Sequence, residues 1–225
     1  MNYRERQYDF LEDVDRVSLG SMSSGTWQID PKRLVFTLAR YKFVAKMLHG
    51  RSRVLEVGCG DGWASRIVLQ SVRELVLSDF DPKFVSEVNS RSHSFDGRQI
   101  EAVTLNPLQS PLERNYDGIY ALDVIEHIHP SSEDQFMTSI CAGLVDFGTV
   151  IIGMPSLESQ KYASAASVAG HVNCKSQEDF RQMMENYFET VFMFSMSDEV
   201  VHTGFGPMAN YLLGIGVQAK VDPLN

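Results

Sequence analysis

The stretch Arg53-Val54-Leu55-Glu56-Val57-Gly58-Cys59-Gly60-Asp61-Gly62-Trp63 decides the fold of this 225-residue chain. Its first half is largely apolar, which is typical of a parallel strand covered on both faces. Three glycines follow at alternate positions, and glycine both adopts positive φ and lets a ligand approach the backbone. Residues 63–71 predict a helix whose free N–H groups point back at this turn. Strand, turn and helix together predict a nucleotide-type cofactor site at the carboxyl end of a parallel sheet.

The glycine turn resembles the first motif of the class I S-adenosylmethionine-dependent methyltransferases, which places an acid two residues before the first glycine. Glu56 stands at that position, whereas Trp63 replaces the third glycine of the dinucleotide-binding fingerprint. The resemblance implies a Rossmann-like α/β sandwich of three layers, with a seven-stranded, mostly parallel sheet that has one antiparallel strand. It also implies S-adenosylmethionine as the cofactor, with Glu56, Gly58, Cys59 and Gly60 at its binding turn.

Further positions that the family uses for its cofactor follow the next strands. The apolar run 74–79 ends in Asp79, where an acid can accept hydrogen bonds from ribose hydroxyls. By the resemblance, four more residues contact the adenine ring or the methionine amino group: Phe80, Asn106, Leu108 and Leu122. The adenine-edge contact is assigned to Leu108 because Pro107 has no N–H to donate. The resemblance also brings Arg40 or Tyr41 near the methionine carboxylate.

The stretch Asp123-Val124-Ile125-Glu126-His127 resembles the fourth-strand motif of the family and supplies candidate catalytic groups. Methyl transfer from a sulfonium needs in-line alignment and the exclusion of water. A hydroxyl acceptor needs in addition a base within hydrogen-bond reach, or a metal that acidifies it. His127 and His171 are the candidates for catalytic groups, and His171 lies in a polar segment where it can serve as a general base.

A metal site is the second interpretation of the same residues. In the ubiquinone-pathway O-methyltransferases and the small-RNA 2′-O-methyltransferases, which this stretch also resembles, the corresponding positions hold magnesium. That resemblance implies a divalent ion on Asp123, Glu126, His127 and His171. The same pattern is common in class I enzymes that bind no metal, where the acid and the imidazole cap the following turn. We therefore favour the metal-free interpretation.

The segments outside these motifs are expected to govern the choice of acceptor within a single domain, 1–225. Residues 1–29 are polar, read as loop around Trp27, and are expected to form an N-terminal arm or lid. Residues 154–175 are rich in Ser, Tyr, His and Asn, and predict an insertion that covers the acceptor. Between and after these segments, Asp81 and Ser176 predict helix starts.

Composition excludes several classes of partner. A net charge of −9 disfavours a broad electrostatic grip on a nucleic-acid backbone. No apolar run approaches the roughly 20 residues that span a bilayer, and the first residues are too charged for a signal peptide. Three widely spaced cysteines favour free thiols in a reducing compartment, so we expect a cytoplasmic protein. The oligomeric state is not specified by the sequence.

These observations predict a methyltransferase that acts on a hydroxyl, or an amine, of a small polar acceptor. Residues 30–34 and 156–173 are similar to uncharacterised bacterial methyltransferases of the surface-polysaccharide type, which implies a sugar. Two alternatives stay open. One is a methyltransferase that acts on RNA or protein, and the other is a non-catalytic S-adenosylmethionine-binding module.

Overall fold

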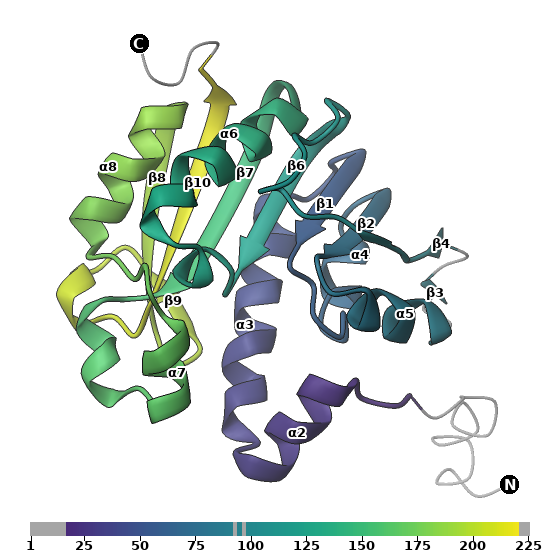
Figure 1. Ribbon diagram of the computed structural model, residues 1–225, viewed down its shortest axis with the longest axis horizontal. Coiled ribbons are helices and arrows are strands. Elements are labelled where there is room, and N and C mark those ends of the chain that lie inside the picture. The colour runs from purple at the N-terminus through teal and green to yellow at the C-terminus, as the bar shows by residue number, and fades with distance from the viewer. Residues whose placement is uncertain (1–16, 92–93, 96–97, 221–225) are drawn as a thin grey trace, which may run out of the picture.

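The computed structural model describes residues 17–91, 94–95 and 98–220. Its centre is an eight-stranded sheet in the order β5-β2-β1-β6-β7-β10-β8-β9, with helices on both faces (Figure 1). A separate ribbon pairs β3 (Ser94–Phe95) with β4 (Arg98–Gln99). The three layers around a mostly parallel sheet confirm the Rossmann-like fold that the glycine turn predicted.

Five neighbouring strands run parallel: β5 (Glu101–Thr104), β2 (Glu74–Asp79), β1 (Arg53–Val57), β6 (Tyr116–Leu122) and β7 (Leu144–Pro155). The antiparallel strand β10 (Tyr211–Ala219) then separates β7 from β8 (Phe188–Ser197). Seven strands were predicted, and the additional one is β9 (Val200–His202), which pairs with the end of β8. This strand forms because Asp198, at φ 52°, allows a two-residue hairpin turn.

Helices pack on both faces of this sheet. One face carries α3 (Lys32–Met47), α4 (Arg66–Leu69) and α5 (Pro82–Ser90), and the other carries α6 (Glu133–Gly143) and α8 (Gln177–Tyr187). The connections contain α2 (Ser21–Ile29), α7 (Ala165–Gly170) and the 3-10 helices η2 (Ile125–His127), η3 (Pro130–Ser132), η4 (Glu158–Tyr162) and η5 (Gly206–Met208). Within the described ranges, none of these helices is long and apolar enough to cross a membrane.

Local hydrogen bonds explain which helix predictions hold. Asp81 caps α5 by accepting from the N–H of Lys83 at 2.9 Å, and Ser176 caps α8 by accepting from the N–H of Asp179 at 3.1 Å. Two predictions were wrong. Residues 63–71 are helical only over α4, and the loop predicted before residue 29 contains α2. Helix α2 forms because side chains from other parts of the chain bind its first turn, an interaction that local sequence does not reveal.

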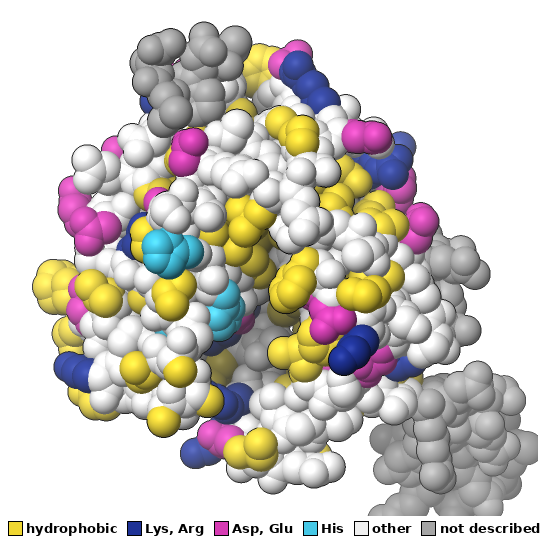
Figure 2. Space-filling model, in the orientation of Figure 1, with side chains coloured by type: hydrophobic (Ala, Val, Ile, Leu, Met, Phe, Trp, Pro, Cys, Tyr) yellow, Lys and Arg dark blue, Asp and Glu magenta, His cyan; other side chains and the backbone are white. Residues whose placement is uncertain are grey.

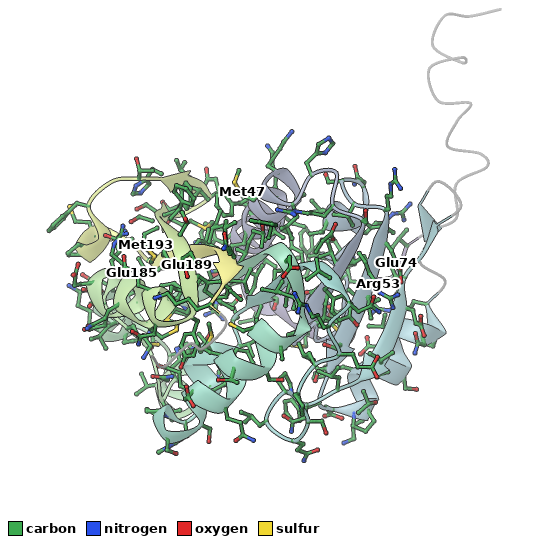
Figure 3. All side chains as sticks on the ribbon, turned by 90° about the horizontal axis from the view of Figure 1, so that it is seen from above. Met47, Arg53, Glu74, Glu185, Glu189 and Met193 are labelled. Atoms are coloured by element: carbon green, nitrogen blue, oxygen red, sulfur yellow. The ribbon has the colours of Figure 1, made fainter. Side chains whose placement is uncertain are left out.

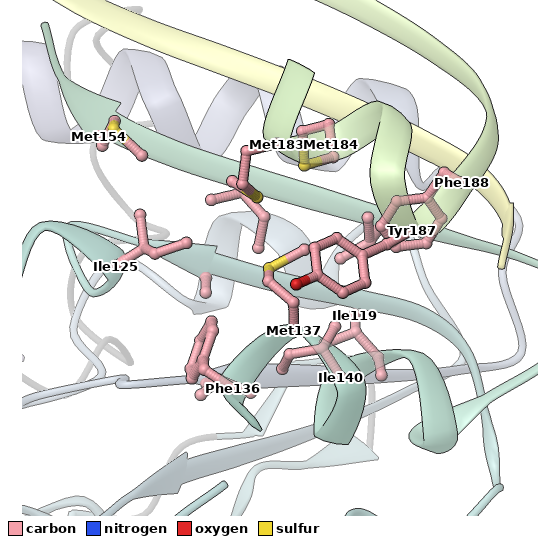
Figure 4. Close-up of a cluster of buried hydrophobic side chains, with 14 of the residues drawn as sticks. Ile119, Ile125, Phe136, Met137, Ile140, Met154, Met183, Met184, Tyr187 and Phe188 are labelled. Carbon is pink, nitrogen blue, oxygen red and sulfur yellow. The ribbon is translucent and has the colours of Figure 1, made fainter. Parts of the chain in front are cut away.

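The larger core lies between the sheet and helices α6 and α8 (Figure 4). Phe136 and Met137 of α6 and Met184 of α8 are almost fully buried there, against strand residues such as Ile119 and Met154. Methionine suits this interface because its unbranched side chain adapts to irregular gaps. The core fixes β6 and β7 from one side, and thereby fixes the loops at their carboxyl ends.

Polar contacts at the amino ends of the strands lie away from those loops. Arg53 and Glu74, the first residues of the paired strands β1 and β2, form an exposed ion pair at 3.4 Å (Figure 3). Such a pair contributes at most about 1 kcal/mol. The motif residues gather instead at the carboxyl edge, at the lower end of the sheet in Figure 1, where α2 and α7 also lie.

Phe136→Ala is expected to destabilise the protein by about 3–5 kcal/mol, because it removes a buried ring and leaves a cavity under α6. Urea unfolding followed by circular dichroism measures the change. Phe147→Ala is the matched control, since that ring is 67% exposed and its loss should cost less than about 0.5 kcal/mol. Equal effects of the two substitutions would contradict the assignment of the core.

Candidate active site

A buried carboxylate lies directly beneath the glycine turn. Glu56 is 1% exposed, and its side chain accepts hydrogen bonds from the hydroxyls of Tyr41 and Ser65 at 2.5 Å and of Tyr120 at 2.6 Å. Burial raises the pKa of Glu56 to about 7, although the three hydroxyls act in the opposite direction. Glu56 was predicted to bind the cofactor, and the structure uses its carboxylate to join β1 to β6, to α3 and to the start of α4. The same contact turns Tyr41 away from the role of a cofactor ligand.

The glycine turn itself is fixed by the neighbouring strand β2. The N–H groups of Gly58 and Cys59 both donate to the carbonyl of Ser78, at 2.8 and 2.9 Å. Gly58 has φ 75°, and a Cβ there would lie 2.4 Å from a methyl carbon of Val124. Only glycine fits this position, because both the backbone conformation and the space exclude a side chain. Cys59 is buried, which raises the pKa of its thiol and leaves it unreactive.

Asp79 connects the end of β2 to the turn. Its Oδ2 accepts from the N–H of Gly60, and its Oδ1 accepts from the N–H of Asp81, both at 2.9 Å. Each carboxylate oxygen keeps a second lone pair, so the side chain can still accept a ribose hydroxyl. Phe80 follows with its ring 71% exposed, which leaves an open aromatic face for a base to stack on. Asp79 and Phe80 therefore suit the roles predicted for them.

The predicted adenine-edge contact is altered. The N–H of Leu108 donates to Oδ1 of Asn106 at 3.0 Å, so it is already bonded within the loop. The loop closes in this way because an Asx-type turn forms across Pro107. The donor that Asn106 retains at this edge is its Nδ2. Leu122, the last residue of β6, is buried at 6% exposure, so only its backbone can contact a cofactor.

The residue after β6 has an unusual backbone. Asp123 has φ 56°, a conformation that costs L-residues roughly 1 kcal/mol or more, and its N–H donates to the carbonyl of Gly153 at 3.0 Å. Its carboxylate binds Nη1 of Arg40 through both oxygens, at 2.7 and 2.9 Å. The guanidinium of Arg40 also stacks 3.7 Å from the ring centroid of Tyr211. Asp123, predicted as one of four metal ligands, is thus engaged by Arg40.

The other three predicted ligands lie together. One ligand atom from each of Glu126, His127 and His171 falls within 4.8 Å of the others, and the two rings are 5.1 Å apart. Glu126 is 1% exposed, and neither oxygen of its carboxyl group has a hydrogen-bond partner among the described residues. Burial and the charge of Asp123 raise the pKa of Glu126 well above its usual range. An unpartnered buried carboxyl group is costly, which indicates that a ligand, proton or cation belongs beside it.

The two imidazoles are oriented by carbonyl oxygens behind them. Nδ1 of His127 lies 2.9 Å from the carbonyl of Gly170, and Nδ1 of His171 lies 2.8 Å from Oε1 of Gln160. Since these oxygens can only accept, each Nδ1 carries the proton and each Nε2 keeps its lone pair. Burial and the neighbouring His127 lower the pKa of His171, so its ring is neutral at pH 7. Both rings can therefore accept a proton or bind a cation.

A cavity of about 270 Å³ joins this cluster to the N-terminal helices. One wall consists of Thr26 from α2 and Arg33, Phe36, Thr37 and Arg40 from α3. The other wall contains the three clustered side chains and Ser167 of α7. Figure 2 shows the hollow on this face of the molecule, with histidine at its edge. A larger hollow of about 390 Å³ lies beside Phe147 and Lys220 at the start of β7, but no motif residue lines it.

The sequence interpretation missed most of one wall of this cavity, since of its residues only Arg40 was expected near the bound cofactor. Arg33, Thr37 and Arg40 are spaced four and three residues apart, which places them on one face of α3. That spacing is visible in the sequence, but the sequence does not show which other part of the chain this face of α3 lies against. Thr26 was hidden because α2 was not predicted.

Comparison with known proteins places the chain in a family. The sequence profile of a family described as "Methyltransferase domain" matches residues 29–187, which is more than half of the chain. The chain belongs to this methyltransferase family. The match extends from the last residue of α2 to the last residue of α8 and includes the glycine turn, Asp79 and the Glu126–His127–His171 cluster. The class I methyltransferase resemblance inferred from Glu56 to Gly62 is confirmed.

Curated and solved relatives agree with this family. A probable S-adenosylmethionine-dependent methyltransferase of Mycobacterium tuberculosis is 26% identical over 104 residues, which span 46% of this chain and only 35% of that protein. The fold is similar to the bacterial CtHen1-C methyltransferase domain, with TM-score 0.66, 17% identity and 82% and 100% of the two chains covered. It is also similar to the N-methyltransferase NodS of Bradyrhizobium japonicum WM9, with TM-score 0.60, 14% identity and 85% and 99% covered.

The family and these relatives support S-adenosylmethionine as the cofactor, as the sequence predicted. A second NodS structure contains S-adenosyl-L-homocysteine; it has TM-score 0.57 and 15% identity, and 85% and 91% of the chains are covered. The residues present in this methyltransferase fit such a group. Asp79 offers spare lone pairs, Gly58 and Gly60 adopt the positive φ that the turn requires, and Phe80 is exposed.

Asp79→Ala is expected to weaken the binding of S-adenosylhomocysteine at least about 100-fold, because it removes a charged acceptor and also releases Gly60. Isothermal titration calorimetry measures the affinity. Asp81→Ala is the matched control, since that acid caps α5 two residues away and should leave the affinity within about threefold. If the two variants bind equally well, the ribose assignment is wrong.

Proposed function

We propose that this methyltransferase transfers a methyl group from S-adenosylmethionine to a hydroxyl of a small polar acceptor, bound in the cavity beside Glu126, His127 and His171. One observation carries the proposal. A buried, unpartnered carboxyl group lies beside two imidazoles whose Nε2 lone pairs are free. An amine acceptor needs little more than alignment and desolvation, whereas a hydroxyl must lose a proton during transfer.

The cofactor supplies an electrophilic methyl group on a sulfonium sulfur. Nε2 of His171 is the proposed acceptor of the hydroxyl proton, because the ring is neutral and Gln160 holds its Nδ1–H in place. The carboxyl oxygens of Glu126, which have no partner among the described residues, would accept a hydrogen bond from the resulting imidazolium. His127, whose ring lies beside that of His171, would orient the acceptor oxygen. The acceptor oxygen gains the methyl group, and the sulfur keeps the electron pair of the broken C–S bond.

The cavity walls support a small, hydroxylated acceptor. A volume of about 270 Å³ is just below the usual range of small-molecule sites. Thr26, Thr37 and Ser167 line it with hydroxyl groups, and Arg33 adds a positive charge. Such a lining suits a polyol, so a sugar derivative is the acceptor class that we propose. The alternative is an acceptor on RNA or protein. A net charge of −9 counts against RNA.

His171→Asn is expected to lower the rate of methyl transfer by about 100-fold or more, because the base is lost. The assay follows labelled methyl groups from S-adenosylmethionine into a small-molecule extract, into RNA and into protein, separately. His129→Asn is the matched control, since within the described residues that imidazole forms its hydrogen bonds with Ser131. In wild type, kcat/KM should fall as the pH drops through the lowered pKa of His171, and the variant should lose this limb.

Three outcomes would contradict the proposal. Label that enters RNA or protein alone would exclude a small acceptor. Tight cofactor binding with no label in any fraction would favour the non-catalytic module. A His171→Asn variant that keeps full activity would exclude His171 as the base.

Treatment with a chelator is expected to leave turnover unchanged, because Arg40 rather than a cation neutralises Asp123. The experiment compares rates after EDTA treatment and after re-addition of Mg²⁺ or Mn²⁺. The remaining donors do resemble a metal site, since each imidazole Nδ1–H is held by a carbonyl oxygen. Activity that is lost with EDTA and restored by Mg²⁺ would therefore assign Glu126, His127 and His171 to a divalent ion.

A further inference from the structure

Helix α2 lies directly against the glycine turn that the cofactor requires. A Cβ on Gly20, which precedes α2, would lie 2.3 Å from the side chain of Asp61. A Cβ on Gly60 would lie 2.8 Å from the sulfur of Met22. The first turn of α2 is therefore in contact with the turn on both sides. A cofactor that binds against Gly60 would therefore lie close to Met22.

Two acids from other elements bind the start of α2. Glu87 of α5 accepts from the N–H of Ser21 at 2.7 Å and from its hydroxyl at 2.6 Å. Asp61 accepts from the N–H of Ser23 at 2.7 Å and from its hydroxyl at 3.2 Å. The first N–H groups of a helix have no partner within it, and the capping residue Gly20 offers no side chain. These two carboxylates thus supply the cap, and their charge suits the positive end of the helix dipole.

The rest of α2 is weakly attached. Not one of its nine residues is buried, and its two largest apolar side chains, Trp27 and Ile29, are 58% and 83% exposed. A helix without a buried face gains little from the hydrophobic effect. Its position depends instead on the two acids at one end and on the covalent link to α3 at the other. That link contains Asp30, which has an extended backbone between the two helices.

The same helix also forms part of the acceptor cavity. Thr26, one turn beyond Ser23, lines the cavity opposite the histidine cluster. A change at the glycine turn that moves α2 therefore also moves a wall of the cavity. This connects two parts of the site that lie on opposite sides of the carboxyl edge.

We infer that α2 is a lid, that Asp61 and Glu87 are the positioning residues that hold it closed over the cofactor, and that Thr26 carries its position to the acceptor. Cofactor product leaves when the contacts of Ser21 and Ser23 to these acids break. The acceptor wall then opens with the lid, so that a closed acceptor cavity exists only together with a closed cofactor site. The part of this inference that concerns Thr26 rests on the proposed function.

The experiment measures the dissociation rate of labelled S-adenosylhomocysteine in two variants. Glu87→Lys places a positive charge at the N-terminus of α2, and Ser21→Pro removes both donors to Glu87. Proline is tolerated at the first helical position. Gly20 already has the extended backbone conformation that a residue before proline prefers. Each variant should release the product about tenfold faster, the factor expected when a hydrogen bond to a charged group is lost. Ser86→Lys is the matched control for Glu87→Lys, since Ser86 is the exposed neighbour of Glu87 on α5.

Further readouts distinguish a lid from a merely structural contact. Hydrogen exchange of amides 21–29 should slow when S-adenosylhomocysteine binds to wild type, and should not slow in Glu87→Lys. The acceptor KM should rise in both variants while the melting temperature stays at that of Ser86→Lys. Dissociation rates within twofold of wild type, or a lowered melting temperature without faster release, would overturn the inference. The release assay needs no acceptor, so absence of transfer to small molecules would refute the proposed function and leave the lid intact.

Discussion

The carboxylate of Glu56 is the interaction on which the site depends. A buried charge of this kind is unstable unless hydrogen bonds replace its lost hydration. Here three hydroxyls do so, from Tyr41 on α3, Ser65 before α4 and Tyr120 on β6. These hydrogen bonds connect β1, which leads into the glycine turn, to helix α3 on one side and on the other to β6, which leads into residues 123–127. The acid of the motif fixes the frame in which the cofactor site forms.

From this frame the carboxyl edge separates into two halves. On one side, Asp79 holds Gly60 and leaves acceptor capacity for a ribose. On the other side, Asp123 adopts a strained backbone and pairs with Arg40, which leaves the neighbouring Glu126 without a partner. Strain and an orphaned buried acid are costs that a fold sustains where they serve a ligand. Together they indicate that the second half of the edge is the reactive one.

Two segments outside the glycine-turn and strand motifs contribute residues to the cavity lining. Residues 156–173 are joined to the segment after β6 through the carbonyl of Glu126, which accepts from the N–H groups of Val172 and Asn173 at 2.8 and 3.0 Å. This places His171 beside His127 although 44 positions separate them in sequence. Helix α2 closes the other side through Asp61 and Glu87. A fold alone does not specify the acceptor, so these two segments are where this enzyme would acquire its own specificity.

The sequence by itself determined the parallel sheet, the glycine turn and the cofactor. Apolar runs and glycine spacing act through local backbone chemistry, so Gly58, Asp79 and the caps at Asp81 and Ser176 could be predicted from neighbours in the chain. Tertiary structure alone decided which hydroxyls bind the carboxylate of Glu56, the pairing of Asp123 with Arg40 and the existence of α2. Each of these depends on a charge meeting a partner 9 to 83 positions away, and no local pattern encodes which partner it meets. Glu56 and Glu126 are equally buried, at 1% exposure, so the position of hydroxyl groups from distant elements decides that Glu56 is hydrogen-bonded while Glu126 has no partner among the described residues.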